Sequence, residues 1–421
     1  MVGRIVACGI LLICASLGLF LAARTQEAEP AVTPTRILLN LPADAARTAT
    51  ITWRTDQPLD KAVIQYCEAS ADPRFVNTAL SESGTTQAVE REHGTVYYHT
   101  ANLRNLTPST RYSYRVGDGT TWSEWLDFTT ASKDPSPFSF IYFGDAQNNV
   151  KSMWSRVVRE ANVTLPRAAF MLHAGDLINI ADADREWDEW FQAGGWLHAT
   201  IPTVATPGNH EYKSGQLSPY WRPQFEFPRN GVAGLEDTNY YIDYQGVRII
   251  SLNTLEKIEE QAIWLDTALW SSNARWNILT FHHPVYSTAK GRDNPKIRNA
   301  WLPVILKHKV DLVLQGHDHS YGRKNVPHGA SLRQQSTLFV VSVSGPKMYA
   351  LGDTVTAEMN ASAEYAQLFQ VISIDGGTLR FRAYKATGEL YDECTLIKDS
   401  DSNGKTPDGK RAGSTLIPGT K

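Results

Sequence analysis

Two hydrophobic patterns divide the chain near residue 135. Before that point, short segments such as residues 48–53 and 111–116 alternate polar and apolar positions, and turn-forming residues separate them. A period of two is typical of strands that bury one face, and short strands at this spacing favour an all-β sandwich. Residues 131–137 contain Ser, Lys, Asp and two Pro, a composition typical of a linker. We therefore expect an N-terminal β-sandwich over residues 31–131.

After the linker, the apolar residues form short continuous runs. Such runs are typical of strands covered on both faces, and they occupy residues 138–143, 168–173, 201–205, 278–281 and 310–314. Stretches that look helical lie between them, at residues 153–160, 187–197, 259–270 and 297–308. Strands that alternate with helices predict an α/β domain, which we place at residues 138–397.

Both ends of the chain differ from its body. Residues 5–23 form an uncharged apolar run after Arg4, a pattern typical of an export signal. The run ends in small residues that suit cleavage, but it is also long enough for an uncleaved membrane anchor, so both interpretations of residues 1–23 stay open. Either one predicts an exported protein that is periplasmic, secreted or held at the cell surface. Residues 398–421 are rich in Gly, Ser, Asp and Lys and predict a flexible tail.

The composition adds three constraints. The chain has 421 residues, of which 42% are hydrophobic, so it is large enough for two ordered cores. Its formal net charge of −3 gives no overall electrostatic footprint for nucleic acid. Beyond the predicted signal the sequence holds only Cys67 and Cys394, which form either one disulfide or two buried thiols.

Polar residues gather directly after each of the five apolar runs. Loops at the carboxyl ends of strands in an α/β sheet meet at one edge, where ligand sites form. The pattern therefore predicts one polar site built from five loops. In chain order, these loops contribute Asp145, Asp176, Asn209 with His210, His282 with His283, and finally His317 with His319.

The residue types in these loops indicate a metal site. Two carboxylates, an amide oxygen and several imidazoles form a mixed oxygen and nitrogen set that suits zinc, iron or manganese, divalent or of mixed valence. The set is too large for one ion. Shared between two ions about 3.5 to 4 Å apart, with one carboxylate bridging them, it gives the two-metal arrangement used for in-line attack at phosphorus.

The order of these motifs resembles a known family. The series Gly-Asp, Gly-Asp, Gly-Asn-His-Glu, x-x-x-His and Gly-His-x-His is similar to the signature of the calcineurin-like metallophosphoesterases. Gly-Asn-His-Glu at residues 208–211 and His-Ser-Tyr-Gly-Arg at residues 319–323 resemble the purple acid phosphatase branch, and residues 106–116 resemble a fibronectin type III domain. The resemblance implies a four-layer α/β core in which helices flank two packed, mixed β-sheets.

The resemblance also implies a set of metal ligands. Asp176 would bridge the two ions. The remaining ligands would divide between the ions, with Asp145 and His319 on the first metal and Asn209, His282 and His317 on the second.

The chain departs from the family at the first metal. The tyrosine that purple acid phosphatases place three residues after the bridging aspartate is Asn179 here. The histidine that other metallophosphoesterases place two residues after the first aspartate is Gln147. Gln147, Asn179 or water would then complete this site, and a ferric ion would lack its phenolate ligand.

Four further residues are candidates for contact with the substrate. By the resemblance, His210 would protonate the leaving alkoxide or hold a phosphate oxygen, and its alternative role is to orient a ligand. His283 would reach the substrate or serve packing. The loop after the fourth motif lacks the histidines with which the plant enzymes contact phosphate. Lys290 or Arg292 would replace them as hydrogen-bond donors to phosphate oxygens, and the alternative is that both are solvated loop charges.

These features predict an exported, acid phosphatase-like hydrolase of small-molecule phosphate monoesters. A metal-bound hydroxide would attack phosphorus in line. A phosphodiesterase or nucleotidase on the same metal core is the alternative, because a fold does not fix a substrate. A third reading, an exported binding protein without activity, is opposed by the presence of all six ligand positions.

Overall fold

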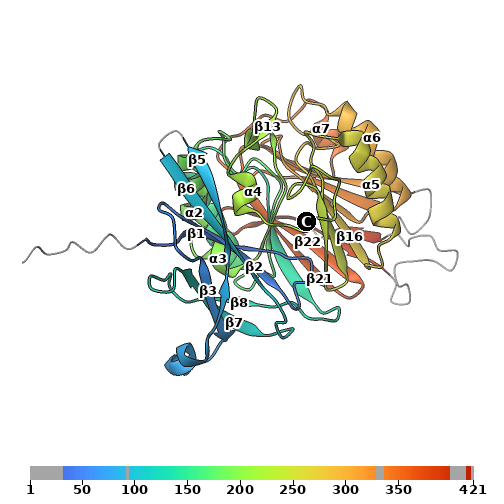
Figure 1. Ribbon diagram of the computed structural model, residues 1–421. Coiled ribbons are helices and arrows are strands. Elements are labelled where there is room, and N and C mark those ends of the chain that lie inside the picture. The colour runs from blue at the N-terminus through green and yellow to red at the C-terminus, as the bar shows by residue number, and fades with distance from the viewer. Residues whose placement is uncertain (1–31, 92–93, 329–335, 399–413, 419–421) are drawn as a thin grey trace, which may run out of the picture.

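The computed structural model describes residues 32–91, 94–328, 336–398 and 414–418 (Figure 1). The predicted signal or anchor at residues 1–23 lies outside these ranges. Within them, no helix is both long and apolar enough to cross a membrane. The N-terminal strands lie on one side of the molecule, and helices α5 and α6 lie on the other.

The N-terminal part is built from two layers of strands, as the alternating pattern predicts. One layer is a four-stranded sheet in the order β4 (Leu80–Ser83), β3 (Val63–Glu68), β7 (Arg111–Gly117), β8 (Leu126–Thr129). The other contains β1 (Thr35–Asn40), β2 (Ala49–Thr55), β6 (Gly94–Leu103) and β5 (Thr85–Arg91). Side chains that alternate inward, including Trp53, Ile64 and Tyr114, form the core between the layers.

A hydrogen bond fixes the entry into β7. The hydroxyl of Tyr112 accepts a hydrogen bond from the backbone N–H of Thr107 at 2.9 Å, which ties the preceding loop to the start of the strand. The next inward tyrosine, Tyr114, donates its hydroxyl to the carbonyl of Ala199 at 2.6 Å. Because Ala199 belongs to helix α3 (Leu197–Thr200) of the α/β part, the sandwich core is tied directly to that part.

The two parts of the chain also share a sheet. Strand β1 pairs in parallel with β11 (Thr203–Ala205) through Asn40 and Thr203, which joins the sandwich to the first sheet of the α/β part. The result is an eleven-stranded sheet in the order β24 (Thr415–Pro418), β23 (Leu390–Ile397), β22 (Thr378–Lys385), β21 (Leu368–Asp375), β9 (Phe138–Phe143), β10 (Met171–His173), β11, β1, β2, β6, β5. Three arginines reinforce the junction. Arg36, Arg54 and Arg91 form ion pairs with the carboxylate of Asp184 at 2.7 to 2.9 Å.

The α/β part packs two mixed sheets face to face. In the first, β9 (Phe138–Phe143), β10 (Met171–His173) and β11 run parallel, and β21 (Leu368–Asp375), β22 (Thr378–Lys385) and β23 (Leu390–Ile397) continue it in antiparallel fashion. The second has seven strands, in the order β14 (Tyr240–Tyr244), β15 (Val247–Ser251), β16 (Trp276–Thr280), β17 (Leu312–Gln315), β19 (Ser336–Val341), β18 (Tyr321–Pro327) and β20 (Ala361–Ala363).

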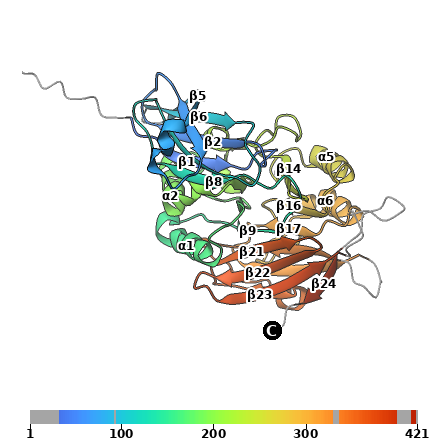
Figure 2. The same cartoon turned by 90° about the horizontal axis from the view of Figure 1, so that it is seen from below.

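Helices cover the outer faces of both sheets (Figure 2). Helices α1 (Ser155–Thr164), α2 (Asp184–Gly194) and α3 (Leu197–Thr200) accompany the first sheet, and α5 (Ile258–Trp270) and α6 (Pro295–Lys307) cover the second. In β16, Ile278 faces the core between the sheets and Leu279 faces α5 and α6. A strand buried on both faces needs a continuous apolar run, which is the pattern in the sequence. The predicted four-layer α/β core is confirmed.

Short elements complete the described chain. They connect the main strands and helices and lie mostly in loops. They are η1 (Pro73–Thr78), η2 (Val150–Trp154), η3 (Asn209–Glu211), β12 (Tyr212–Lys213), β13 (Gln216–Leu217), α4 (Trp221–Gln224) and α7 (Val355–Glu358).

The C-terminal tail corrects one prediction. Residues 398–421 were expected to be flexible because they are polar, but Thr415–Pro418 forms strand β24, antiparallel to β23. The segment has two β-branched residues and Leu416 within four positions, and it satisfies the backbone groups of β23 that would otherwise lie at the sheet edge. The two cysteines follow the thiol alternative. Cys67 and Cys394 are buried and free, and burial raises the pKa of Cys394 to about 12.

Candidate metal centre

Five loops from two sheets meet between the carboxyl ends of their strands. The loops after β9, β10 and β11 carry Asp145, Asp176 and Asn209 from the first sheet. The loops after β16 and β17 carry His282, His317 and His319 from the second. The sequence predicted this convergence, and the packing of the two sheets is what brings the loops together.

The side chains form two overlapping groups that share one residue. Asp176, His282 and His317 make one group, and Asp145, Asp176 and His319 make the other. Within each group, one ligand atom from every residue lies within 4.8 Å of the others. Asp176 is common to both, which is the position that the bridging prediction gives it.

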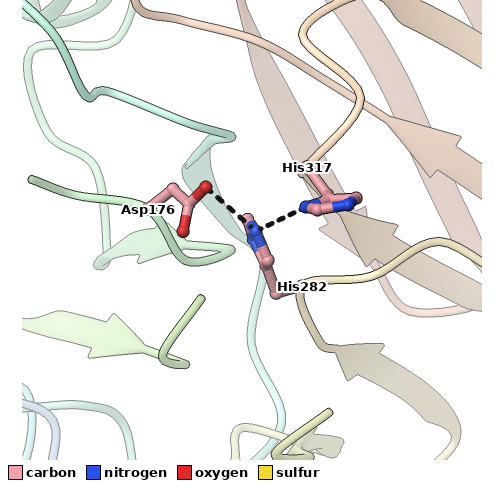
Figure 3. A group of neighbouring side chains, drawn as sticks. All are labelled: Asp176, His282 and His317. Atoms are coloured by element: carbon pink, nitrogen blue, oxygen red, sulfur yellow. Dashed lines mark hydrogen bonds and ion pairs between the residues drawn. The ribbon is translucent and has the colours of Figure 1, made fainter. Parts of the chain in front are cut away.

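The group around His282 is compact (Figure 3). The Nε2 atom of His282 lies 3.1 Å from Asp176 Oδ2, 3.2 Å from His317 Nδ1 and 3.2 Å from Asn209 Oδ1. Its other nitrogen, Nδ1, donates to the carbonyl of Ala174 at 2.8 Å. This hydrogen bond sets the ring orientation and directs Nε2 toward the other three candidate ligand atoms.

The group around Asp145 is looser. His319 Nε2 lies 3.7 Å from Asp145 Oδ1, and His319 Nδ1 donates to the carbonyl of Lys347 at 3.0 Å. The side-chain amide nitrogen of Gln147 lies between the groups, 3.0 Å from Asp176 Oδ2 and 2.9 Å from His319 Nε2. A rotation of this amide by 180° would place the Gln147 oxygen, instead of the nitrogen, between Asp176 and His319.

Strained backbone holds four of these residues. Asp145, Asp176, His317 and His319 have φ angles of 26°, 52°, 75° and 49°. Residues other than glycine rarely adopt this left-handed region, and each such residue costs about 1 to 3 kcal/mol. Strain that persists at four positions in one cluster is typical of a functional site.

The glycines of the motifs provide space for the carboxylates. A Cβ atom on Gly208 would lie 2.2 Å from Asp176 Oδ1, and one on Gly316 would lie 2.3 Å from Asp145 Oδ2. Both distances are too short for any side chain. The Gly-Asn-His-Glu and Gly-His-x-His patterns therefore need glycine for close approach to the two aspartates.

Burial and mutual charge determine the protonation of the cluster. Burial lowers the pKa of His319 to about 3 and holds that of His317 well below its usual range, so both rings stay neutral and keep a free lone pair. Burial also acts to lower the pKa of His282, but Asp176 and Asp145 outweigh it and raise the value to about 9.

The pKa values of the two aspartates are shifted in opposite directions. Burial raises the pKa of Asp145 well above its usual range. Burial acts on Asp176 in the same direction, but His282 and His210 reverse the effect and lower its pKa. A positively charged His282 thus balances the carboxylate of Asp176.

These observations fit a pair of metal ions. Asp145 Oδ1 and Gln147 Oε1 are buried without a hydrogen-bond partner among the described residues, which is costly for polar atoms unless something binds them. Cations here would replace the proton on His282 and stabilise both carboxylates as anions. The mixed oxygen and nitrogen donors suit zinc, iron or manganese.

Glu211 is a structural residue of the centre to which the sequence analysis gave no role. Its buried carboxylate accepts hydrogen bonds from the backbone N–H groups of Gly208, Asp176, Leu177 and Ile178 at 2.7 to 3.3 Å. It therefore joins the loops that carry Asp176 and Asn209. The sequence did contain a signal for this role, because Glu211 is the last residue of the Gly-Asn-His-Glu motif.

His210 lies at the edge of the cluster. Its Nδ1 donates to the carbonyl of Asn179 at 2.6 Å, and its Nε2 lies 4.0 Å from Asp176 Oδ2. The side chain is one quarter exposed, so the ring lies between the cluster and the solvent. Asn179 takes part through its backbone, because its N–H also donates to Glu186 at 2.6 Å.

The three remaining candidates have different surroundings. His283 bonds through Nδ1 to Thr254 at 2.7 Å and packs against the ring of His317 at 4.0 Å. Lys290 is an exposed residue whose ammonium pairs with Asp353 at 2.9 Å. Arg292 instead donates to the carbonyl of His317 at 2.6 Å, which places its guanidinium beside the cluster.

Comparisons with known proteins agree with this architecture. Residues 34–130 match the family described as Purple acid Phosphatase, N-terminal domain, and residues 139–321 match Calcineurin-like phosphoesterase. An uncharacterized protein of Mycobacterium tuberculosis is 30% identical over 274 residues, which cover 55% of this chain and 51% of that protein. The Fe(3+)-Zn(2+) purple acid phosphatase 12 of Arabidopsis thaliana is 25% identical over 295 residues, which cover 65% of this chain and 61% of that protein.

A solved structure shows the same fold. The purple acid phosphatase from yellow lupin seeds superimposes with a TM-score of 0.76 and 18% sequence identity, covering 92% of this chain and 78% of that one. The match to the Mycobacterium tuberculosis protein spans about half of that relative's length. The family resemblance predicted from the motifs is confirmed. The chain is a purple acid phosphatase-like protein, in which the N-terminal domain of that family precedes a calcineurin-like phosphoesterase domain.

Proposed function

We propose that this protein is an exported hydrolase of phosphate monoesters that works with two metal ions. The observation that carries the proposal is the sharing of Asp176 by two groups of metal-binding side chains. Two ions bound there would activate water as a nucleophile and neutralise the phosphoryl oxygens. The apolar run at residues 5–23 supports export.

The ligands divide between the two groups. Asp176 would bridge, and Asn209, His282 and His317 would hold one ion. Asp145 and His319 would hold the other, with Gln147 as its further donor. Gln147 is better placed than Asn179 for this role, because it contacts both Asp176 and His319. The Arabidopsis relative is named for Fe(3+) and Zn(2+). Because Asn179 supplies no phenolate, we propose divalent ions in both positions.

His210 is the proposed acid for the leaving group. Its Nδ1 proton is used by the Asn179 carbonyl, so Nε2 is the nitrogen free to exchange a proton with the substrate. The 4.0 Å separation from Asp176 places this nitrogen beside the bridging position without making it a ligand. The hydrogen bond to the Asn179 carbonyl fixes the orientation of the ring.

Metal reconstitution combined with a substrate panel tests this function. Metal-free protein would be loaded with zinc, iron or manganese and assayed on aryl and alkyl monoesters and on a diester. Two ions per chain and a preference for monoesters are expected. A preference for the diester would replace the monoesterase proposal with a phosphodiesterase. A protein that binds no metal and hydrolyses neither class would contradict the enzymatic proposal.

A further inference from the structure

Two cations and an aromatic ring lie beside the metal centre and have no role in the proposed ligand set. We call Arg292, Lys347 and Tyr349 the cationic arm. Arg292 belongs to the loop before α6, whereas Lys347 and Tyr349 belong to the loop after β19. The three residues come from two segments that meet next to His317 and His319.

Arg292 is fixed in place but retains free donors. Its Nη1 donates to the carbonyl of His317 at 2.6 Å and lies 3.6 Å from the buried Asp318. Its guanidinium stacks on the ring of Tyr349 at 4.7 Å. The side chain is 30% exposed. Within the described ranges, the Nε and Nη2 groups of Arg292 donate no hydrogen bond to the protein, so they can donate to a bound anion.

Lys347 and Tyr349 extend the arm to the other histidine. The carbonyl of Lys347 accepts the Nδ1 proton of His319 at 3.0 Å, and the ring of Tyr349 lies edge-on to the ring of His319 at 4.9 Å. The ammonium of Lys347 lies 5.7 Å from the centre of the Tyr349 ring. In the described part of the chain, no carboxylate forms an ion pair with this ammonium. Both cations therefore flank one aromatic ring.

The position of the arm separates it from the scissile phosphate. The proposed metal ligands use His317 Nδ1 and His319 Nε2, whereas the arm contacts the backbone of His317 and the opposite side of His319. Lys347 adds a positive charge there, and Arg292, although it pairs with Asp318, adds its free Nε and Nη2 donors. A planar guanidinium and an ammonium are the groups that bind phosphate oxygens best. The arm is suited to a second anionic group on the same substrate.

We propose that the cationic arm binds a second phosphate of the substrate, so that the enzyme prefers small organic bisphosphates to monophosphates. This inference rests on the proposed phosphatase function. The scissile phosphate would occupy the metal centre, and the second phosphate would bind Arg292 and Lys347. The sugar or other group between them would be the part that leaves.

Glucose 6-phosphate and glucose 1,6-bisphosphate test the arm, because they differ only in the second phosphate. The wild type should show a higher kcat/KM for the bisphosphate. Lys347→Gln should lower the ratio of the two kcat/KM values about tenfold, mainly through KM, as expected for loss of one charge-assisted contact. Arg292→Lys should lower it less, because a positive charge remains. Lys290→Gln is the matched control, since that lysine pairs with Asp353, and it should leave both values unchanged.

The outcomes separate the arm from the enzymatic proposal. Hydrolysis of both sugars at similar rates, or a ratio that Lys347→Gln does not change, would overturn the arm and leave the phosphatase proposal standing. If metal-loaded protein hydrolyses neither sugar, equilibrium binding of the same two compounds replaces the kinetics. Tighter binding of the bisphosphate that Lys347→Gln removes would support the arm, and equal binding would overturn it. Metal content is measured in each variant, because Arg292 touches the backbone of a proposed ligand.

Discussion

The two halves of the metal centre share Asp176 but differ in how they are packed. In the half around His282, three donor atoms lie within 3.2 Å of one imidazole nitrogen. In the half around Asp145, the carboxylate lies 3.7 Å from His319, and a glutamine amide fills the space between the groups. The compact half keeps the family's residues, whereas the looser half is the one where Gln147 and Asn179 depart from them.

This difference shows how the centre can lose a usual ligand and keep its frame. Glu211 holds the Asp176 and Asn209 loops through four backbone N–H groups, and the motif glycines leave room for the carboxylates. None of these contacts depends on the identity of residue 147 or residue 179. A change at either position therefore alters the donor set of one half without moving the loops.

Removal of the shared residue should have the largest effect. Asp176→Ala should release both ions and lower activity by more than the 10- to 100-fold that is typical when a group supporting a ligand is lost. Asp145→Ala should release the ion of its own half first. Elemental analysis of both proteins measures this. An Asp176→Ala protein that keeps one tightly bound ion would show that the aspartate serves only one half. Asp353→Ala, an exposed carboxylate, is the control and should keep both ions.

Loss of His210 should separate two kinds of substrate. An alkoxide hardly leaves without a proton, whereas a nitrophenolate does, and general acids contribute about 10² to 10⁴ in rate. His210→Ala should therefore slow alkyl phosphates far more than nitrophenyl phosphate in steady-state kinetics. Variants with unchanged metal content are compared. Equal slowing of both substrates would assign His210 to phosphate binding or to ligand orientation.

A smaller effect is expected from substitutions in the looser half, around Asp145. Gln147→Ala should weaken the ion held by Asp145 and His319 by about 10- to 100-fold, because it removes a side chain that contacts both groups. Asn179→Ala should change metal affinity little, because the contacts of Asn179 are made by its backbone. Titration of metal-free protein with zinc, followed calorimetrically, compares the two. A larger loss with Asn179→Ala would reverse the assignment.

The same half predicts a missing colour. With Asn179 in the place of the phenolate, protein loaded with iron should lack the intense visible band of a tyrosinate bound to ferric ion. An absorbance spectrum of the active protein is sufficient. A purple preparation would mean that another tyrosine coordinates iron.

The strands and the loops of the metal centre could be predicted from the sequence, because both depend on the pattern of neighbouring residues. Continuous apolar runs predicted β9, β16 and β17, and polar residues directly after them predicted Asp145, His282 and His317. The pairing of Asn40 with Thr203, which joins the two parts, has no local signal, since one parallel contact depends on how whole sheets pack. Strand β24 was missed because its four residues follow a polar stretch and are ordered by the edge of β23.

The roles of individual side chains were likewise predictable only where a local motif contained them. Position in a motif was enough to place Asp176 at the centre of the cluster. The choice between Lys290 and Arg292 was not visible, because both are cations in one loop and only the fold gives them different partners. Lys347 had no motif at all. Its proposed role rests on a backbone carbonyl that accepts a hydrogen bond from His319 and on an ammonium that forms no ion pair with a carboxylate among the described residues.

Anomalous diffraction from crystals of the metal-loaded protein would show directly whether two ions share Asp176. Two anomalous peaks about 3.5 to 4 Å apart are expected, with the Asp176 carboxylate between them. His282 and His317 should ligate one ion, and Asp145 and His319 the other. A single peak, or two peaks of which only one contacts Asp176, would contradict it.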